Sequence, residues 1–233
     1  MQKKISIIIP VYNEKSTIGK ILEKIDKVDL GETEKEVILV DDYSTDGSRE
    51  ILRRLENKYA VIYHEKNRGK GRAIRSGLEK ATGDWVIIQD ADLEYDPEDY
   101  KKLLAKIQEP DAEAVYGSRR LYSNYFSDRH SGHIFALGGI FLTWLTNLLY
   151  NANITDEPTC YKMFKTDLIK NLNLRCERFE FCPEVTAKIA KRKIKIHEVP
   201  INYYPRHKDE GKKINWRDGL EAIWTLIKYK FKG

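Results

Sequence analysis

The first half of the chain alternates short apolar runs with segments of helical periodicity. The apolar runs indicate buried strands at five places along the chain: residues 5–9, 37–40, 61–63, 85–89 and 114–116. Between them, apolar residues recur every three or four positions, which predicts helices over residues 16–25, 46–55, 70–81 and 97–108. Strands that alternate with helices are typical of an α/β fold, so we predict a mostly parallel central sheet with helices on both faces.

The second half of the chain is less regular. Residues 134–150 form an apolar stretch shorter than the ~20 residues needed to cross a bilayer, which leaves either a core helix or a helix lying in a membrane surface. A helical pattern over residues 179–191 precedes a predicted strand over residues 194–199. Residues 216–231 form an amphipathic helix whose end carries alternating lysines. That helix suits either a peripheral membrane contact or an ordinary C-terminal helix with a solvated end.

No linker rich in Pro, Gly or Ser divides the 233 residues, so we predict a single domain over residues 1–233. The hydrophobic share of 41% and the charged share of 33% are those of a folded chain with a packed core. Three cysteines without a paired C-x-x-C spacing indicate neither a disulfide framework nor a zinc site. Because no apolar signal peptide opens the chain, we expect the protein to be cytoplasmic.

The positive charge is concentrated at one end of the chain. The net charge is +5, and residues 188–233 hold thirteen Lys and Arg against five Asp and Glu, so the remainder is net negative. This basic end suits the phosphates of a nucleotide or a lipid, or an anionic membrane surface. A nucleic-acid partner is not expected, because the segment contains no nucleic-acid-binding motif.

Three carboxylates at alternating positions, Asp90, Asp92 and Glu94, follow the fourth predicted strand. Such oxygen ligands suit Mg²⁺ or Mn²⁺, which also take phosphate oxygens, although a short acidic pattern alone fits a solvated loop equally well. Four polar loops follow predicted strands, at residues 12–14, 41–48, 67–71 and 90–92. Because ligands bind outside the carboxyl ends of parallel strands, we predict that these loops form a nucleotide site with a metal ion.

The motifs of these loops occur together in a known order. They are I-P-V-Y-N-E at 9–14, D-D-Y-S-T-D-G at 41–47, N-R-G-K-G-R-A at 67–73 and D-A-D-L at 90–93, followed by G-S-R at 117–119, I-T-D at 154–156, E-V-P-I at 198–201 and Arg206. In this order they resemble the large inverting glycosyltransferase family that includes the dolichol-phosphate mannose synthases. The resemblance covers most of the chain and implies the Rossmann-like GT-A fold. It also implies a donor and metal side over about residues 1–118 and an acceptor side over about residues 119–233.

The resemblance implies metal-dependent transfer of a hexose, mannose or glucose, from a GDP- or UDP-sugar to a polyprenyl or dolichyl phosphate. It implies that the donor is bound by residues of the first strands and loops: Pro10, Tyr12, Glu14, Val40, Asp42, Lys70, Asp90 and Ala91. The implied metal ligands are Asp90, Asp92 and Glu94, the last two binding directly. Arg119 is expected near a donor or acceptor phosphate, and Arg206 and Lys212 are expected to close over the diphosphate.

Whether the reaction needs a general base depends on the acceptor. A phosphate acceptor is already anionic near neutral pH, so it needs no strong base. If the acceptor were instead a hydroxyl of a glycan or lipid, Asp156 occupies the family position of the general base. Asp156 fits equally well as a residue that positions its own loop. Arg129 is a further candidate for the acceptor phosphate, because a guanidinium pairs with two phosphate oxygens.

The chain departs from the family pattern in three ways. Glu94 stands where lipid-linked synthases commonly have Gln, and Tyr43 stands where a small residue is frequent. The chain also ends at Gly233 without paired transmembrane helices, so membrane contact is expected to be peripheral, at the cytoplasmic face, or through a membrane partner protein. A non-catalytic nucleotide-sugar binder is the alternative from another class. Nucleotidyl transfer is disfavoured, because the first strand is not followed by a Gly-rich loop.

Overall fold

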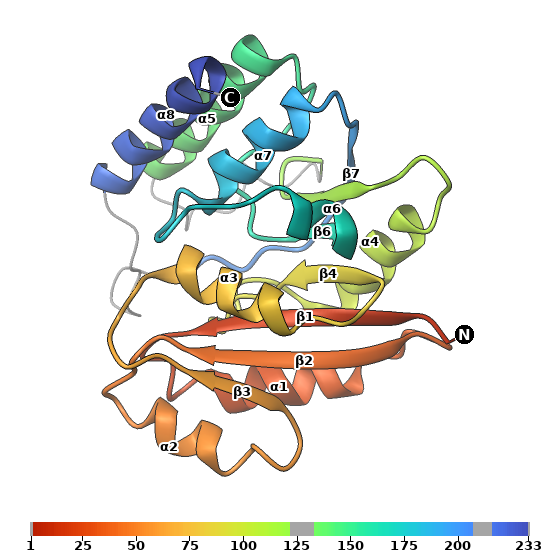
Figure 1. Cartoon of the computed structure of the whole chain (residues 1–233), viewed down its shortest axis with the longest axis vertical. Helices are drawn as coiled ribbons and strands as arrows, with labels where there is room; N and C mark the ends of the chain where they lie inside the picture. The colour runs from red at the N-terminus through yellow and green to blue at the C-terminus, as the bar shows by residue number, and fades with distance from the viewer. Residues whose placement is uncertain (1, 122–132, 207–215, 233) are drawn as a thin grey trace.

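The computed structural model describes residues 2–121, 133–206 and 216–232, and it arranges their strands in one seven-stranded sheet (Figure 1). The strands are β1 (Lys4–Val11), β2 (Glu34–Asp41), β3 (Ala60–Tyr63), β4 (Trp85–Ile88), β5 (Ala114–Ser118), β6 (Lys162–Lys165) and β7 (Ile196–Pro200). Their order across the sheet is β3-β2-β1-β4-β6-β5-β7. All pairs are parallel except those of β6, which runs antiparallel to both β4 and β5. The predicted α/β fold with a mostly parallel sheet is confirmed.

Strand β6 is the strand that the sequence did not predict. Its sequence K-M-F-K begins with Lys162, a charged residue that is nevertheless fully buried. The Lys162 ammonium donates hydrogen bonds to the backbone oxygens of Glu157 at 2.6 Å and Thr159 at 2.5 Å. A buried ammonium needs such partners, and they come from a neighbouring loop. The pattern of apolar residues therefore gave no signal for this strand.

Helices cover both faces of the sheet. One face carries α1 (Ile18–Lys27), α2 (Ser48–Arg53) and α4 (Tyr100–Ile107), which follows the 3₁₀ turn η1 (Pro97–Asp99). The other face carries α3 (Lys70–Lys80), α6 (Thr166–Asn171) and α7 (Phe181–Lys191). Successive side chains of a strand point to opposite faces, and accordingly Ile5, Ile7 and Ile9 pack into the first core while Ile8 packs into the second.

Two longer helices, α5 (His133–Tyr150) and α8 (Trp216–Phe231), pack against each other and against α7 (Figure 1). The Tyr150 hydroxyl donates to the Leu226 carbonyl at 2.5 Å, which joins the two helices. Both helices also expose large apolar side chains, each at least 47% exposed: Leu137, Phe141, Trp144, Leu148, Trp216, Leu220, Trp224 and Phe231. Within the described ranges, no helix combines the length and the apolar character needed to cross a membrane.

The order in which the chain adds strands to the sheet reverses at β1. From β1 the chain builds β2 and β3 on one side, and it then returns to β4 on the other side of β1. In open α/β sheets such a switch point leaves a crevice outside the carboxyl ends of the two central strands. The loops after β1, β2 and β4 therefore meet at one edge of the sheet, and that edge carries a large cavity.

Candidate active site

A cavity of 1160 Å³ lies at the carboxyl ends of the strands. Its wall contains most of the residues that the family resemblance assigned to ligands: Pro10, Tyr12, Glu14, Asp42, Lys70, Asp90, Ala91, Asp92, Glu94, Arg119 and Arg206. The wall does not include Val40, which is buried in the core beside α3, or Asp156, which has no exposed surface. Arg129 and Lys212 lie outside the described residues.

Cationic side chains face the carboxylates that follow β4. Lys70 Nζ lies 2.5 Å from Asp90 Oδ1, and Arg206 Nη2 lies 3.1 Å from Asp92 Oδ2. The pKa of Asp92 is nevertheless raised to about 7, first by burial and then by the charges of Asp90 and Glu94. The cations of the site therefore do not fully compensate its negative charge.

The donor set suits a divalent cation that also binds a ligand. No three acidic, His or Cys side chains in the described part of the chain form a complete metal cluster. Mg²⁺ needs only one or two protein carboxylates, because phosphate oxygens and water complete its shell. Asp92, whose pKa is raised even with Arg206 beside it, and Glu94 are the residues that could hold such an ion directly, whereas Lys70 compensates the charge of Asp90 and the pKa of Asp90 is lowered.

Arg206 connects three loops across the cavity. Its Nη1 and Nη2 each lie 3.3 Å from a carboxylate oxygen of Glu14, which follows β1. Its Nη2 also pairs with Asp92, and its backbone N–H donates to Glu94 Oε1 at 3.0 Å. The guanidinium is thus held among the carboxylates while lying on the cavity wall, where it can meet an anionic ligand.

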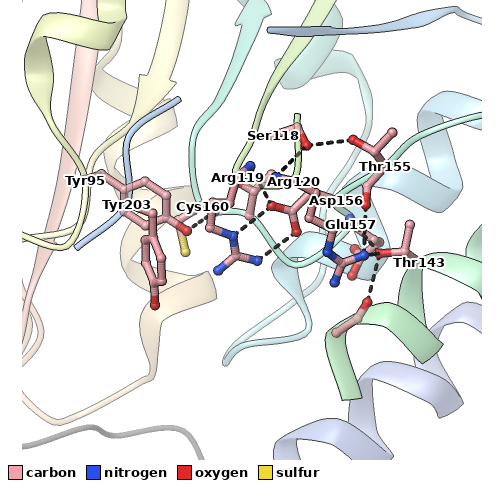
Figure 2. Close-up of polar contacts among 12 residues, drawn as sticks. Tyr95, Ser118, Arg119, Arg120, Thr143, Thr155, Asp156, Glu157, Cys160 and Tyr203 are labelled. Carbon is pink, nitrogen blue, oxygen red and sulfur yellow. Dashed lines mark hydrogen bonds and ion pairs between the residues drawn. The ribbon is translucent and has the colours of Figure 1, made fainter. Parts of the chain in front are cut away.

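Asp156 forms a buried ion pair with Arg119 (Figure 2). Arg119 Nε and Nη2 donate to the two carboxylate oxygens of Asp156 at 2.7 and 2.8 Å, and the Arg119 backbone N–H donates a third bond at 3.0 Å. Although burial alone would raise the pKa of Asp156, the Arg119 charge and these hydrogen bonds lower it. Asp156 therefore orients Arg119, whose guanidinium lies on the cavity wall and 5.0 Å from the centre of the Tyr203 ring.

Asp42 holds a loop that lines the cavity. Its carboxylate lies 2.7 Å from His64 Nδ1 and accepts hydrogen bonds from the backbone N–H groups of Arg68 and Gly69 at 2.8 and 2.7 Å. The other nitrogen of His64 lies 3.0 Å from the Ser76 hydroxyl on α3. A carboxylate has about four acceptor positions, so Asp42 keeps one for a ligand. No motif in the sequence marks His64 or Ser76, because their roles depend on contacts between distant segments.

Further cavity residues lie outside the motifs marked in the sequence. They include Glu157, Cys160 and Cys182. Cys160 Sγ accepts a hydrogen bond from Lys70 Nζ at 3.1 Å. The only sequence signal for Glu157 and Cys160 is that they follow the I-T-D motif at residues 154–156, one and four residues after its end.

A family model described as "Glycosyl transferase family 2" matches residues 6–172, which is more than half of the chain. The chain belongs to glycosyltransferase family 2. The matched segment runs from within β1 to α6 and includes the loops that hold Asp42, Asp92 and Arg119, whereas Arg206 and the cavity residues of α7 and α8 lie beyond it. The predicted family and the predicted class of enzyme are both confirmed.

Named relatives and solved structures agree with this family. The chain is 29% identical to the UDP-N-acetylglucosamine–dolichyl-phosphate N-acetylglucosaminyltransferase of Methanococcus voltae, over 98% of this chain and 96% of the relative. It is also 29% identical to the undecaprenyl-phosphate 4-deoxy-4-formamido-L-arabinose transferase of Edwardsiella ictaluri, over 89% of this chain and 62% of that one. Glucosyl-3-phosphoglycerate synthase of Mycobacterium tuberculosis, solved with Mn²⁺, UDP and phosphoglyceric acid, superposes on this glycosyltransferase with a TM-score of 0.75. That match is 19% identical and covers 98% of this chain and 79% of the synthase, and it shows the shared GT-A fold.

Proposed function

We propose that this glycosyltransferase moves a hexose from a GDP- or UDP-sugar to a polyprenyl phosphate, with inversion at the anomeric carbon. The observation that carries the proposal is the ion pair between Asp156 and Arg119. A hydroxyl acceptor needs a carboxylate that is free to take its proton, but Asp156 is engaged by three hydrogen bonds from Arg119 and its pKa is lowered. A phosphate acceptor brings its own anionic oxygen and needs no such base. The names of both relatives, which include dolichyl phosphate and undecaprenyl phosphate, support the same acceptor class.

The donor is proposed to lie across the loops after β1, β2 and β4. Pro10, Tyr12 and Glu14 surround the base and ribose, and Asp42 offers its remaining acceptor position to the base. Lys70, Asp90 and Ala91 lie where the diphosphate and sugar begin. Val40 is proposed to support this site from the core, since it is fully buried and not part of the cavity wall.

The reaction is a displacement at the anomeric carbon. An oxygen of the acceptor phosphate, oriented by Arg119, attacks that carbon, and the bond to the nucleotide diphosphate breaks with its electron pair leaving on the diphosphate oxygen. The charge that grows there is stabilised by the guanidinium of Arg206, already placed among the carboxylates by Glu14 and Asp92. A divalent cation, Mg²⁺ or Mn²⁺, when bound at Asp92 and Glu94, supplies further positive charge to the same diphosphate. Lys212 is proposed to assist Arg206.

The acceptor lipid is proposed to reach the cavity from a membrane surface. On α5, Leu137, Phe141, Trp144 and Leu148 recur every three or four residues, which places them in one exposed stripe. The adjacent α8 adds exposed apolar residues and ends in exposed lysines, which suit anionic lipid headgroups. The cavity wall includes apolar side chains of both helices, so an apolar path joins the candidate active site to this surface. We therefore propose peripheral attachment at the cytoplasmic membrane face.

The proposal is tested by following labelled sugar from UDP- and GDP-hexoses onto a polyprenyl phosphate in detergent, with Mn²⁺, with Mg²⁺ and with a chelator. We expect a lipid-soluble product whose sugar is released by mild acid, as a glycosyl phosphate is, and no product with the chelator. Arg119→Lys should lower the rate at least tenfold, because an ammonium cannot reproduce the paired hydrogen bonds of a guanidinium. Absence of the acid-labile lipid product with every hexose and metal tested would overturn the proposal.

A further inference from the structure

Glu157 is a buried acid on the cavity wall. Its side chain has no exposed surface, and neither carboxyl oxygen has a partner among the described residues. Glu157 nevertheless forms part of the wall of the cavity that contains Arg119 and Asp92. Leaving a buried polar group unpaired is unfavourable, because the group has lost its hydrogen bonds to water. Such a group on a cavity wall is therefore a candidate for binding a ligand that supplies the missing partner.

The main chain holds Glu157 in place. Its backbone N–H donates to the Thr143 hydroxyl of α5 at 3.0 Å, and its carbonyl accepts a bond from Lys162 at 2.6 Å. Figure 2 shows Glu157 directly beside Asp156 and Thr143, on the same loop that fixes Arg119. The main chain of Glu157 is thus held by α5 and β6 next to the Arg119–Asp156 pair, so the unpaired oxygens do not result from a loose loop.

Burial favours the neutral form of Glu157, although the cations Lys162, Arg119 and Arg120 lie near it. Arg120 donates at 3.1 Å to the Thr143 hydroxyl that also accepts the backbone N–H of Glu157 (Figure 2). Burial is the main cause that raises its pKa, to about 8, and nearby Cys182 of α7 and Asp156 act in the same direction. The charges of Lys162 of β6 and Arg119 lower the pKa of Glu157, but by less than burial raises it. Lys162 is itself engaged by two backbone carbonyls and lies 4.2 Å from the centre of the Tyr116 ring of β5. Glu157 therefore presents an O–H donor to the cavity at neutral pH.

We propose that Glu157 binds the acceptor phosphate beside Arg119, as a neutral carboxylic acid that donates a hydrogen bond to a phosphate oxygen. This inference rests on the proposed function. A phosphate dianion offers only acceptors, so it is complementary to the O–H group and to the guanidinium together. An ionised Glu157 would instead place a like charge next to the phosphate in a buried site, where the repulsion is poorly screened. Glu157 is thus predicted to set the upper pH limit for acceptor binding.

The test measures the KM for polyprenyl phosphate and the KM for the nucleotide sugar between pH 6 and 9, in the wild type, Glu157→Gln and Glu157→Ala. In the wild type, the KM for polyprenyl phosphate should rise above about pH 8, by up to tenfold per pH unit, since one proton is lost. Glu157→Gln keeps a neutral donor, so it should hold a low KM without that rise. Glu157→Ala should raise this KM about tenfold at all pH values, and the KM for the nucleotide sugar should stay within twofold throughout.

Two outcomes would overturn the inference while leaving the proposed function intact. One is a rise of the acceptor KM with pH in Glu157→Gln that matches the wild type. The other is a Glu157→Ala variant with the wild-type acceptor KM. The melting temperature of each variant shows whether a loss comes from unfolding, and Glu157→Gln answers the question if Glu157→Ala does not fold. If the wild type glycosylates only hydroxyl acceptors, with a rate that rises with pH through Glu157, the proposed function and this inference both fail.

Discussion

The role of each buried carboxyl group depends on the residues that it is bonded to. Asp156 and Glu157 are neighbours in the sequence and both are fully buried, but their chemistry is opposite. Burial tends to raise the pKa of both groups, but the Arg119 charge and its hydrogen bonds lower the pKa of Asp156, whereas burial raises the pKa of Glu157 to about 8 and no donor among the described residues reaches its oxygens. The I-T-D motif drew attention to Asp156, but it did not distinguish a general base from a residue that positions its loop. Arg119, which pairs with Asp156, follows β5 and lies about 40 residues earlier in the chain. The pairing therefore depends on tertiary structure and not on the local sequence.

Removal of the Asp156 charge should destabilise the protein strongly. Asp156→Asn leaves the guanidinium of Arg119 in a buried site without its counter-charge, which costs about 3 kcal/mol in the free energy of unfolding. Asp84→Asn is a matched control, because its ion pair with Lys3 lies on the surface and contributes less than about 1 kcal/mol. Urea denaturation of both variants measures the difference. Equal losses in the two variants would contradict the role given to the Arg119–Asp156 pair.

The raised pKa of Glu157 also predicts how stability depends on pH. Above pH 4.5 the carboxyl ionises in the unfolded chain but keeps its proton in the folded protein until about pH 8. Unfolding releases a proton over this interval, so the folded state should lose stability relative to Glu157→Gln by about 1.4 kcal/mol per pH unit. Denaturation of the two proteins from pH 4.5 to 9 measures the difference, which should level off above about pH 8. A difference independent of pH would show that the buried carboxyl is ionised throughout.

At the scale of elements, the sequence predicted what depends on local pattern. The apolar runs placed six of the seven strands, and the helix predicted over residues 134–150 agrees with α5 to within one residue. The convergence of the four polar loops was predictable as well, because the carboxyl ends of parallel strands share one edge. Strand β6 was missed because Lys162 is buried against carbonyl groups of another loop. The clamp of Asp42 and His64 was missed for the same physical reason, since both depend on tertiary contacts.

The loop held by Asp42 should not tolerate a side chain at Gly69. Gly69 has a φ of +86°, and a Cβ atom there would lie 2.3 Å from the Glu177 carbonyl oxygen. Gly69→Ala should therefore lower the melting temperature and weaken nucleotide binding, because this loop lines the cavity. Gly19→Ala is the control, since Gly19 lies in α1 with nothing within 4 Å of the added atom, and it should gain about 0.5–1 kcal/mol. Calorimetric titration with UDP and GDP measures the binding, and unchanged affinity in Gly69→Ala would contradict the clamp.

At the scale of the whole molecule, one cavity joins the two halves of the chain. Its wall runs from the loops of β1 to β4 to the apolar side chains of α5 and α8. A polar end suited to a nucleotide diphosphate and an apolar end suited to a lipid are thus continuous. This arrangement follows from the packing of α8 on α5 and α7, which the sequence pattern could not specify.

The exposed stripe of α5, together with the exposed apolar side chains of α8, should bind membranes. Trp144 is 56% exposed and Trp224 is 64% exposed, and Trp144→Ser and Trp224→Ser each remove one of these aromatic side chains. The double variant should bind vesicles with anionic lipids at least tenfold more weakly than the wild type. Tyr43→Ser, which changes an exposed aromatic residue after β2, should leave vesicle binding unchanged. Co-sedimentation with vesicles measures both. Equal binding by the double variant and the wild type would place the membrane contact elsewhere.

The attacking oxygen of the proposed reaction belongs to a phosphate and needs no protein base. A comparison of kcat/KM for a polyprenyl phosphate with kcat/KM for the polyprenol of the same chain length, using the same nucleotide sugar, tests this mechanism. The two acceptors differ only in the phosphate, so lipid binding is matched. We expect the phosphate to be preferred by at least a thousandfold, since the alcohol lacks both the anionic oxygen and the contact with Arg119. Comparable values for the two acceptors would contradict it.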